Sequence, residues 1–311
     1  MNGVGSAPRR VAFDVPEFDE APYEPDDIEV SRETSPTLPR PPAARVFVVA
    51  NQKGGVGKTT TVVNLAVGLA QGGLRTLVID LDPQGNASTA LGIDHSEGTP
   101  GTYEVLSGQP MADVVQRSPE SPQLLVLPAT IDLAGAEITL VSEFARESKL
   151  LHAVSAYLQD HPTDYVFIDC PPSLGLLTVN ALVAAKEILI PIQCEYYALE
   201  GVSQLLRTID LVRQSMNERL ELTTVILTMF DGRTRLASQV ANEVREHFPR
   251  QTLETVIPRS VRVSEAPSYG QSVLTYHAAS AGAQAYLSAA EELAARGAVS
   301  AAPNETSEEH R

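Results

Sequence analysis

A glycine-rich segment between a hydrophobic run and a helical pattern carries the clearest chemistry in this sequence. It reads RVFVVANQKGGVGKTTT over residues 45–61, which predicts a strand, a loop and a helix in succession. Gly54, Gly55 and Gly57 permit positive φ angles, so backbone N–H groups can turn inward at the helix start and cradle phosphate oxygens. Lys58 would lie against the β- and γ-phosphates, and Thr59 would ligate Mg²⁺. The segment therefore predicts a P-loop.

The same segment departs at one position from the pattern G-x-x-x-x-G-K-[ST], because Gln52 stands where the first glycine is expected. Lys53, beside it, adds a second lysine to the loop. A plain glycine-rich turn would explain the glycines. It would not explain Gly-Lys-Thr at the start of a helix that follows a hydrophobic strand.

Carboxylates stand at the ends of two further hydrophobic strands. The first strand is expected over 76–81 and delivers Asp80 and Asp82 to the edge of the sheet that holds the P-loop. The second lies in YVFIDCPP, residues 165–172, and ends in Asp169. A buried parallel strand with an aspartate at its tip is the Walker B arrangement, in which the carboxylate holds Mg²⁺ through water.

Strand and helix patterns alternate along the rest of the chain. Further strands are expected over 124–128, 187–192, 222–230 and 255–257, and helices over 60–71, 198–216, 236–247 and 281–295. Residues 102–118 suggest short helices, and 133–158 a long helical stretch with a possible break near Ser148. This alternation predicts an α/β fold of the P-loop NTPase type, with a doubly wound, mostly parallel sheet of about seven strands.

Composition narrows the function classes. The chain has 311 residues, with 39 Asp and Glu against 23 Lys and Arg, so binding to nucleic acid would require a local basic patch. The two cysteines, Cys170 and Cys194, fit no disulfide framework and suggest a reducing compartment. No apolar stretch approaches the roughly 20 residues that span a bilayer, and the N-terminus lacks an apolar signal core. We expect a soluble cytoplasmic protein.

Both ends of the chain differ in composition from the middle. Residues 1–44 carry nine acidic residues, four arginines and many prolines, and residues 298–311 form an acidic tail. Such segments bury too little apolar surface to offset the entropy of ordering, so we expect both to be disordered around one domain over 45–297.

Arginines gather in one region of this acidic chain. Residues 200–262 hold nine arginines against eight acidic residues, and four of them form close pairs in sequence: Arg233 with Arg235, and Arg259 with Arg262. One face of the protein could therefore be basic. Ordinary surface ion pairs explain the same arginines equally well.

Several motifs together resemble one known family. KGGVGKTT, DLDPQGN, YVFIDCPPSLG, LTMFDGRT (227–234) and IPRSVRVSEAPSYG (257–270) are closely similar to motifs of the ParA/Soj family of chromosome and plasmid partitioning ATPases, of the deviant Walker A class. The resemblance covers roughly residues 45–296.

The resemblance assigns roles to individual residues. Lys53 matches the signature lysine, which in an ATP-bound sandwich dimer reaches across to the partner's phosphates. Lys58 matches the P-loop lysine and Thr59 the magnesium ligand, Asp82 the aspartate that orients the attacking water, and Asp169 the Walker B aspartate. Lys53, Lys58 and Asp82 are therefore the expected catalytic residues.

The resemblance also implies the remaining contacts. The expected nucleotide-binding residues are Lys53, Gly54, Gly55, Val56, Gly57, Lys58, Thr59, Thr60, Pro258 and Ser260. Pro258 and Ser260 fall where the family contacts the base, although its members commonly carry Asn at the position of Ser260. The expected DNA-binding residues are Arg233, Arg235, Arg259 and Arg262.

The resemblance implies a cycle driven by ATP and Mg²⁺. An ATP-bound homodimer would bind the DNA of the nucleoid without sequence preference, and it would not bind a membrane. A ParB-like centromere-binding protein would stimulate weak intrinsic hydrolysis, which releases the DNA and positions origin regions during segregation. The larger basic surface of a dimer suits such binding, because DNA affinity rises with the number of phosphates contacted.

Four alternatives share parts of this pattern. A MinD-like ATPase would need a basic amphipathic C-terminal helix, whereas this chain ends AVSAAPNETSEEHR. An iron–sulfur reductase like the nitrogenase iron protein uses two cysteines, but Cys170 directly follows Asp169 and suits a buried core position. A tyrosine autokinase would carry a tyrosine-rich tail. A scaffold that uses nucleotide only to dimerise would not require Asp82.

Overall fold

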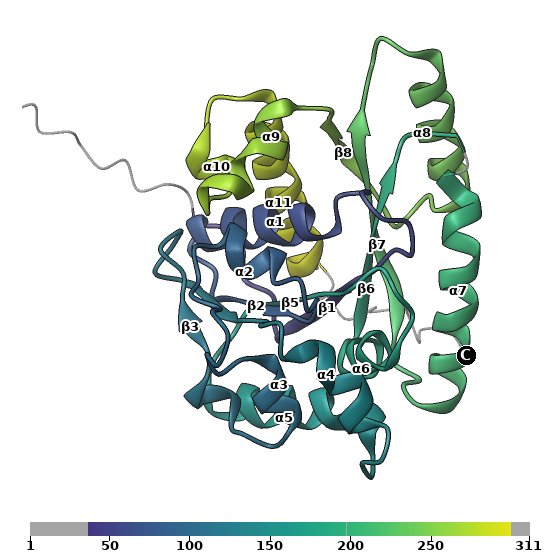
Figure 1. The fold of residues 1–311 in the computed structure, drawn as a ribbon. Helices are drawn as coiled ribbons and strands as arrows, with labels where there is room; N and C mark the ends of the chain where they lie inside the picture. The colour runs from purple at the N-terminus through teal and green to yellow at the C-terminus, as the bar shows by residue number, and fades with distance from the viewer. Residues whose placement is uncertain (1–36, 197, 300–311) are drawn as a thin grey trace, which may run out of the picture. The chain divides into compact units, whose positions relative to one another are not determined.

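A single α/β unit contains all the regular structure that the computed structural model describes, which is residues 37–196 and 198–299 (Figure 1). Its strands are β1 (Arg45–Val49), β2 (Thr76–Asp80), β3 (Gln116–Arg117), β4 (Leu124–Leu127), β5 (Tyr165–Asp169), β6 (Glu187–Gln193), β7 (Glu221–Phe230) and β8 (Thr252–Pro258). Its longer helices are α1 (Lys58–Gln71), α4 (Leu133–Leu140), α5 (Lys149–Asp160), α6 (Leu176–Ala184), α7 (Ala198–Ser215), α8 (Arg235–His247) and α11 (Ala281–Val299). Its shorter helices are α2 (Asn86–Ala90), α3 (Thr102–Leu106), α9 (Val261–Glu265) and α10 (Val273–Tyr276).

The eight strands form one sheet in the order β3-β4-β2-β5-β1-β6-β7-β8. Every neighbouring pair is parallel except β3 and β4, which are antiparallel. The predicted doubly wound, mostly parallel sheet is confirmed. The eighth strand is β3 at the edge, whose two residues are too few to show the alternation by which a strand is recognised in sequence.

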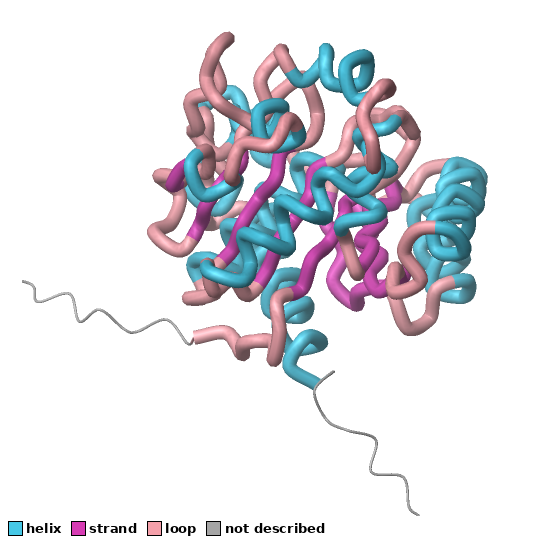
Figure 2. Tube along the Cα trace, turned by 90° about the horizontal axis from the view of Figure 1, so that it is seen from below, coloured by secondary structure: helices cyan, strands magenta, loops and turns pink. Residues whose placement is uncertain are grey.

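Helices cover both faces of the sheet, as Figures 1 and 2 show. On one face, α1, α2, α10 and α11 bury apolar side chains against the strands. On the other face, α4 to α8 form a second buried cluster. The central strands β1, β2 and β5 lie between the two clusters and are almost completely buried, which explains their unbroken apolar sequences.

The predicted helical stretch 133–158 is two helices, α4 and α5, with a connection over 141–148 that includes a short 3₁₀ turn. Asn180 of α6 fixes this break, because its side-chain Nδ2 donates to the carbonyl of Arg146 and its side-chain Oδ1 accepts from the N–H of Leu150. A side chain far along the sequence thus satisfies backbone groups that the connection leaves unpaired.

The described chain extends beyond the expected domain limits. Residues 1–36 and 300–311 of the two expected disordered segments lie outside the described residues. The remaining part of the first segment is packed: the N–H of Leu38 donates to the carbonyl of Gly72 at 2.9 Å, and its side chain covers Gly72. Likewise, α11 continues to Val299. No helix among the described residues has the length and hydropathy needed to cross a membrane.

Candidate nucleotide site

The loop between β1 and α1 leaves its backbone open to solvent on one side. Gly55 and Gly57 have φ angles of 75° and 89°, in the region that favours glycine. A Cβ atom added to Gly54 or Gly55 would meet nothing within 4 Å, so both face open space. Behind the loop, the Thr228 hydroxyl at the end of β7 donates to the carbonyl of Val56 at 2.8 Å. The loop is therefore anchored from β7 and open toward a ligand.

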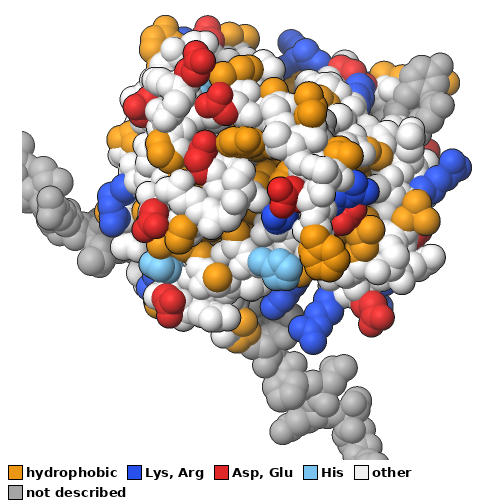
Figure 3. Space-filling model, turned by 60° about the horizontal axis from the view of Figure 1, so that its bottom comes forward, with side chains coloured by type: hydrophobic (Ala, Val, Ile, Leu, Met, Phe, Trp, Pro, Cys, Tyr) orange, Lys and Arg blue, Asp and Glu red, His pale blue; other side chains and the backbone are white. Residues whose placement is uncertain are grey.

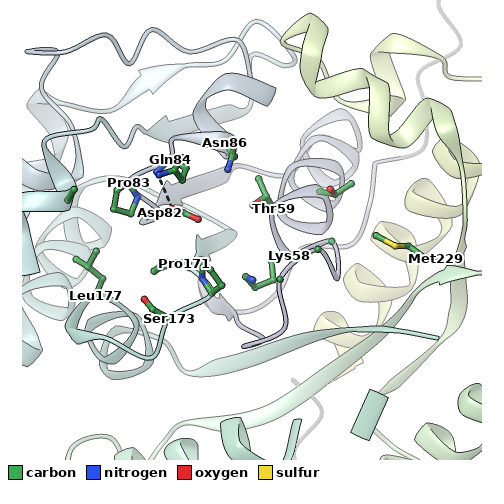
Figure 4. Close-up of a pocket in the computed structure, with 16 residues that line it drawn as sticks. Lys58, Thr59, Asp82, Pro83, Gln84, Asn86, Pro171, Ser173, Leu177 and Met229 are labelled. Carbon is green, nitrogen blue, oxygen red and sulfur yellow. Dashed lines mark hydrogen bonds between the residues drawn. The ribbon is translucent and has the colours of Figure 1, made fainter. Parts of the chain in front are cut away.

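A cleft of about 680 Å³ lies in front of this loop (Figure 4). Its lining comes from the P-loop and the start of α1, from the segments that follow β2 and β5, and from single residues of α4 and β7: Gly54, Gly55, Gly57, Lys58, Thr59, Thr60, Asp82, Pro83, Gln84, Asn86, Ala134, Pro171, Pro172, Ser173, Leu177 and Met229. The side chains of Lys58, Thr59 and Asp82 surround one open space. The three segments that the sequence predicts to meet are thus brought together.

Two buried carboxylates lie side by side under the cleft. Asp80 and Asp169 are paired in register at the ends of β2 and β5, and both are inaccessible to solvent. Asp80 accepts hydrogen bonds from the N–H and hydroxyl of Ser88 and from the N–H of Asp82. Neither oxygen of Asp169 meets a hydrogen-bond donor at ordinary geometry within the described part of the chain.

The environment of these carboxylates disfavours their charged forms. Burial raises the pKa of Asp80 to about 6, against the lowering effect of its bonds with Ser88. Burial and the nearby Asp80 raise the pKa of Asp169 well above its usual range, although the Thr59 hydroxyl acts in the opposite direction. A buried carboxylate without a strong donor fits a cation supplied from outside the chain, and oxygen ligands are those that Mg²⁺ prefers.

Lys58 supplies positive charge at the same point. Its side chain is largely buried, and burial lowers its pKa, while the charges of Asp169 and Asp82 act in the opposite direction. An ammonium held this way is partly desolvated, so it can interact strongly with an anion that enters the cleft.

Asp82 lines the cleft from a hydrogen-bonded turn and is itself largely buried. One oxygen of its carboxylate accepts the N–H of Gln84 at 3.0 Å, which Figure 4 marks, and its own N–H is held by Asp80. Asp80 therefore sets the position of Asp82 through the backbone. The sequence pattern placed Asp80 at this edge, but offered no sign that it organises the loop.

Lys53 does not line the cleft. Its Nζ lies 3.3 Å from the carboxylate of Glu195, and its side chain is 37% exposed. The side chain of Val56 is buried and also does not line the cleft, so any contact of Val56 with a ligand would come from its backbone.

A smaller pocket of about 90 Å³ lies on the other side of the P-loop. Pro258 and Ser260 line it together with Gly57 and Thr60, so the residues expected to contact the base do lie beside the P-loop. Met229 lines both this pocket and the large cleft, and has a φ angle of 51°, which is unusual for a residue with a side chain. Met229 was not predicted to line the site, because no sequence pattern indicates a positive φ angle at a residue other than glycine.

Comparisons with known proteins agree with this geometry. The AAA domain family matches residues 44–222. The chromosome partitioning protein ParA of Caulobacter vibrioides is 52% identical over 253 residues, which cover 81% of this chain and 94% of that protein. The sporulation initiation inhibitor protein Soj of Bacillus subtilis is 50% identical over 255 residues, which cover 81% and 99%. The chain belongs to the ParA/Soj family of chromosome-partitioning ATPases.

A solved structure is also similar to this member of the ParA/Soj family. Cobyrinic acid a,c-diamide synthase from Mycobacterium smegmatis, with bound ATP analogue and magnesium, has a TM-score of 0.69 and 40% identity, and covers 81% of this chain and 94% of that one. That protein is described by another activity, and its identity to this chain is lower than that of the two partitioning proteins.

The four arginines proposed from the ParA/Soj resemblance lie at the ends of β7 and β8. The N–H of Arg259 donates to the carbonyl of Phe230, which joins the two loops. Three of the arginines are in ion pairs: Arg233 with Asp231, Arg259 with Glu195 and Arg262 with Glu265. Arg235 is exposed at the start of α8 and has no ion pair in the described part of the chain. Ordinary ion pairs thus account for three of the four arginines, and the DNA-binding role of this cluster stays a prediction.

The two cysteines of this ParA/Soj member are free and buried. Burial raises the pKa of Cys194 to about 11 and that of Cys170 well above its usual range. Thiols in such surroundings are poor nucleophiles and poor metal ligands, which favours the expectation that both belong to the core. Among the residues described, no three His, Cys, Asp or Glu side chains cluster as metal ligands.

Proposed function

We propose that this ParA/Soj protein binds Mg²⁺ and ATP in the 680 Å³ cleft, dimerises in that state, holds DNA without sequence preference, and releases it after hydrolysis. The observation that carries the proposal is Asp169, a buried carboxylate that meets no hydrogen-bond donor at ordinary geometry among the described residues, near the buried Lys58 and the open glycine loop. Such an arrangement is costly for a protein alone and favourable once a cation and phosphates occupy it.

In this proposal the P-loop binds the phosphates. The open backbone of residues 54–57 and the N-terminus of α1 donate to phosphate oxygens, and Lys58 neutralises their charge. Pro258 and Ser260 contact the base in the smaller pocket, which meets the cleft at Gly57 and Thr60.

Thr59 and Asp169 would hold the metal. When bound, Mg²⁺ neutralises charge that develops on the phosphates during transfer. Thr59 offers a hydroxyl oxygen from the first turn of α1, and Asp169 a carboxylate that acts directly or through water.

Asp82 would orient the attacking water. Its carboxylate lines the cleft, and hydrogen bonds with Asp80 and Gln84 hold its turn in place. A fixed carboxylate lowers the entropy lost when water is aligned for attack. Weak hydrolysis that waits for a ParB-like partner is part of the proposal.

Dimerisation would couple the binding of ATP to the binding of DNA. Lys53 lies outside the cleft lining with a partly exposed side chain, and in a dimer it would leave Glu195 and contact the phosphates of the second copy. The formal net charge of −16 repels DNA, so retention on the nucleoid depends on a local set of arginines, doubled in a dimer.

The deciding experiment measures binding of the full-length protein to non-specific duplex DNA with ATP, with ADP and without nucleotide, and repeats the series on anionic liposomes. The expected result is DNA binding with ATP alone, and a steep decline as salt rises. Liposome binding in place of DNA binding would favour a MinD-like role. Binding to neither, with intact ATP binding, would favour a nucleotide-dependent scaffold.

Lys53→Ala provides the control for the dimer step. The variant should bind ATP with unchanged affinity and remain monomeric in light scattering, because the P-loop and Lys58 are untouched. A dimer formed as readily as by the wild type would contradict the proposed role of Lys53.

A further inference from the structure

The side chain of Glu195 connects the nucleotide site with the arginine region. Glu195 follows β6, and one of its carboxylate oxygens accepts from Lys53 Nζ at 3.3 Å. The other oxygen accepts from Arg259 at 3.3 Å and from the side-chain amide of Gln193. A single carboxylate thus contacts both Lys53 of the P-loop segment and Arg259, which lines the smaller pocket.

Backbone contacts fix where this carboxylate stands. The N–H of Cys194 donates to the carbonyl of Thr228 on β7, and the carbonyl of Glu195 accepts the N–H of Ala198 at the start of α7. Gln193 and Arg259 then orient the side chain. Glu195 is therefore positioned by the sheet edge itself.

Lys53 combines a fixed backbone with a side chain that can move. Its N–H donates to the Asn51 side chain, whose amide in turn donates to the carbonyl of Pro191 in β6. The lysine and glutamate side chains are 37% and 45% exposed, so solvent can replace either partner. Lys53 can leave Glu195 without a change in the P-loop.

We propose that Glu195 is a positioning residue that holds Lys53 in the monomer and thereby restrains ATP-dependent dimerisation. The inference rests on the proposed function, in which Lys53 contacts the partner's phosphates. One ammonium cannot be fully engaged by Glu195 and by those phosphates at once, so each protomer must release its Lys53–Glu195 pair when the dimer forms. Dimers then form only when phosphates compete successfully with Glu195.

The test measures the dimer dissociation constant by sedimentation with Mg²⁺ and an ATP analogue that is not hydrolysed. Glu195→Gln keeps the side-chain volume and removes its charge. Because an exposed ion pair contributes little and a dimer releases two, we expect the constant to fall by about 3-fold to 30-fold. The ATP affinity of the monomer and its thermal stability should stay unchanged. A residue that only stabilised the fold would change one of these two properties.

Two further variants serve as controls. Glu143→Gln removes the same charge from another lysine pair, with Lys149, that includes neither Lys53 nor Arg259, and should leave the dimer constant unchanged. Glu195→Asp keeps the charge and should dimerise more like the wild type than Glu195→Gln does.

Three outcomes would overturn the inference. If Glu195→Gln dimerises no more tightly than the wild type, Glu195 does not restrain dimerisation. If Glu143→Gln dimerises more tightly by the same factor, the effect comes from the change in net charge and not from the Lys53–Glu195 pair. If the wild type itself does not dimerise with the analogue, the proposed function fails together with this inference. If the wild type dimerises and Glu195→Gln matches it, only the inference fails.

Discussion

Charged side chains have opposite environments in the nucleotide cleft and in the arginine region. In the cleft, Asp169 and Lys58 are buried, and Asp169 has no hydrogen-bond donor of ordinary geometry among the described residues. In the arginine region, side chains are exposed and mostly paired, as Arg233 is with Asp231 and Arg262 with Glu265. The two regions adjoin at the Lys53–Glu195–Arg259 contact.

The difference predicts how each region responds to its ligand. Buried unpaired groups gain much from a ligand, because their desolvation has already been incurred in the folded protein. Exposed paired groups gain little individually, because each must first leave an acidic partner. On the side of the molecule in Figure 3, acidic and basic side chains are likewise interspersed, so no broad basic field covers that face.

Asp82→Ala should have the largest effect. Removing a positioned carboxylate is expected to slow ATP hydrolysis by about 10²-fold to 10⁴-fold, with ATP binding preserved because the P-loop and Lys58 are unchanged. Single-turnover hydrolysis and equilibrium ATP binding measure the two properties. The variant should accumulate as a DNA-bound dimer, and a variant that stays monomeric with saturating ATP would contradict the role given to Asp82.

Lys58→Met should reduce ATP affinity by about 10²-fold to 10³-fold, since a buried charge pair with the phosphates is lost. Methionine keeps the length and apolar packing of the lysine stem, so folding should be retained. Titration calorimetry gives the affinity. A loss below tenfold would mean that backbone N–H groups dominate phosphate binding.

Asp169→Asn should shift stability in two directions. Without ligand, the variant should be more stable by about 1–3 kcal/mol, because a neutral amide replaces a buried carboxylate that lies beside the carboxylate of Asp80. With Mg²⁺ and ATP, its gain in stability should be smaller than that of the wild type. Thermal denaturation with and without ligand measures both changes. An unliganded variant that is less stable than the wild type would contradict the proposal that Asp169 binds a cation.

The cleft was largely predictable from sequence, whereas the connection beside it was not. P-loop residues and strand-end carboxylates follow local rules, because parallel strands bring their carboxyl ends together and Gly-Lys-Thr must start a helix. Glu195 is 142 residues from Lys53 and 64 from Arg259, and no local pattern reports such contacts. Met229 and the two-residue strand β3 also depend on tertiary neighbours.

Arg235→Glu should weaken DNA binding more than a change at any of the three paired arginines. Arg235 has no ion pair in the described part of the chain, so its charge is fully available to phosphates. We expect about a tenfold loss of affinity at moderate salt and a shallower salt dependence. ATP-dependent dimers should persist, and unchanged DNA affinity would locate the basic surface elsewhere.

Arg259→Gln should have the smallest effect, and it tests the contact between the two regions. Arg259 shares the Glu195 carboxylate with Lys53, so its charge is partly neutralised before DNA arrives. When Lys53 leaves for phosphates, Glu195 still faces Arg259, and the arginine stays paired in the dimer. DNA affinity should therefore fall by only about 2-fold, within what an exposed ion pair contributes.

In the Glu195→Gln background the same Arg259→Gln change should lower DNA affinity further, because the arginine there lacks its acidic partner. If Arg259→Gln lowers DNA affinity equally in the wild type and in Glu195→Gln, then Glu195 does not restrain Arg259. DNA binding by the arginine region would then be independent of the contact with the nucleotide cleft.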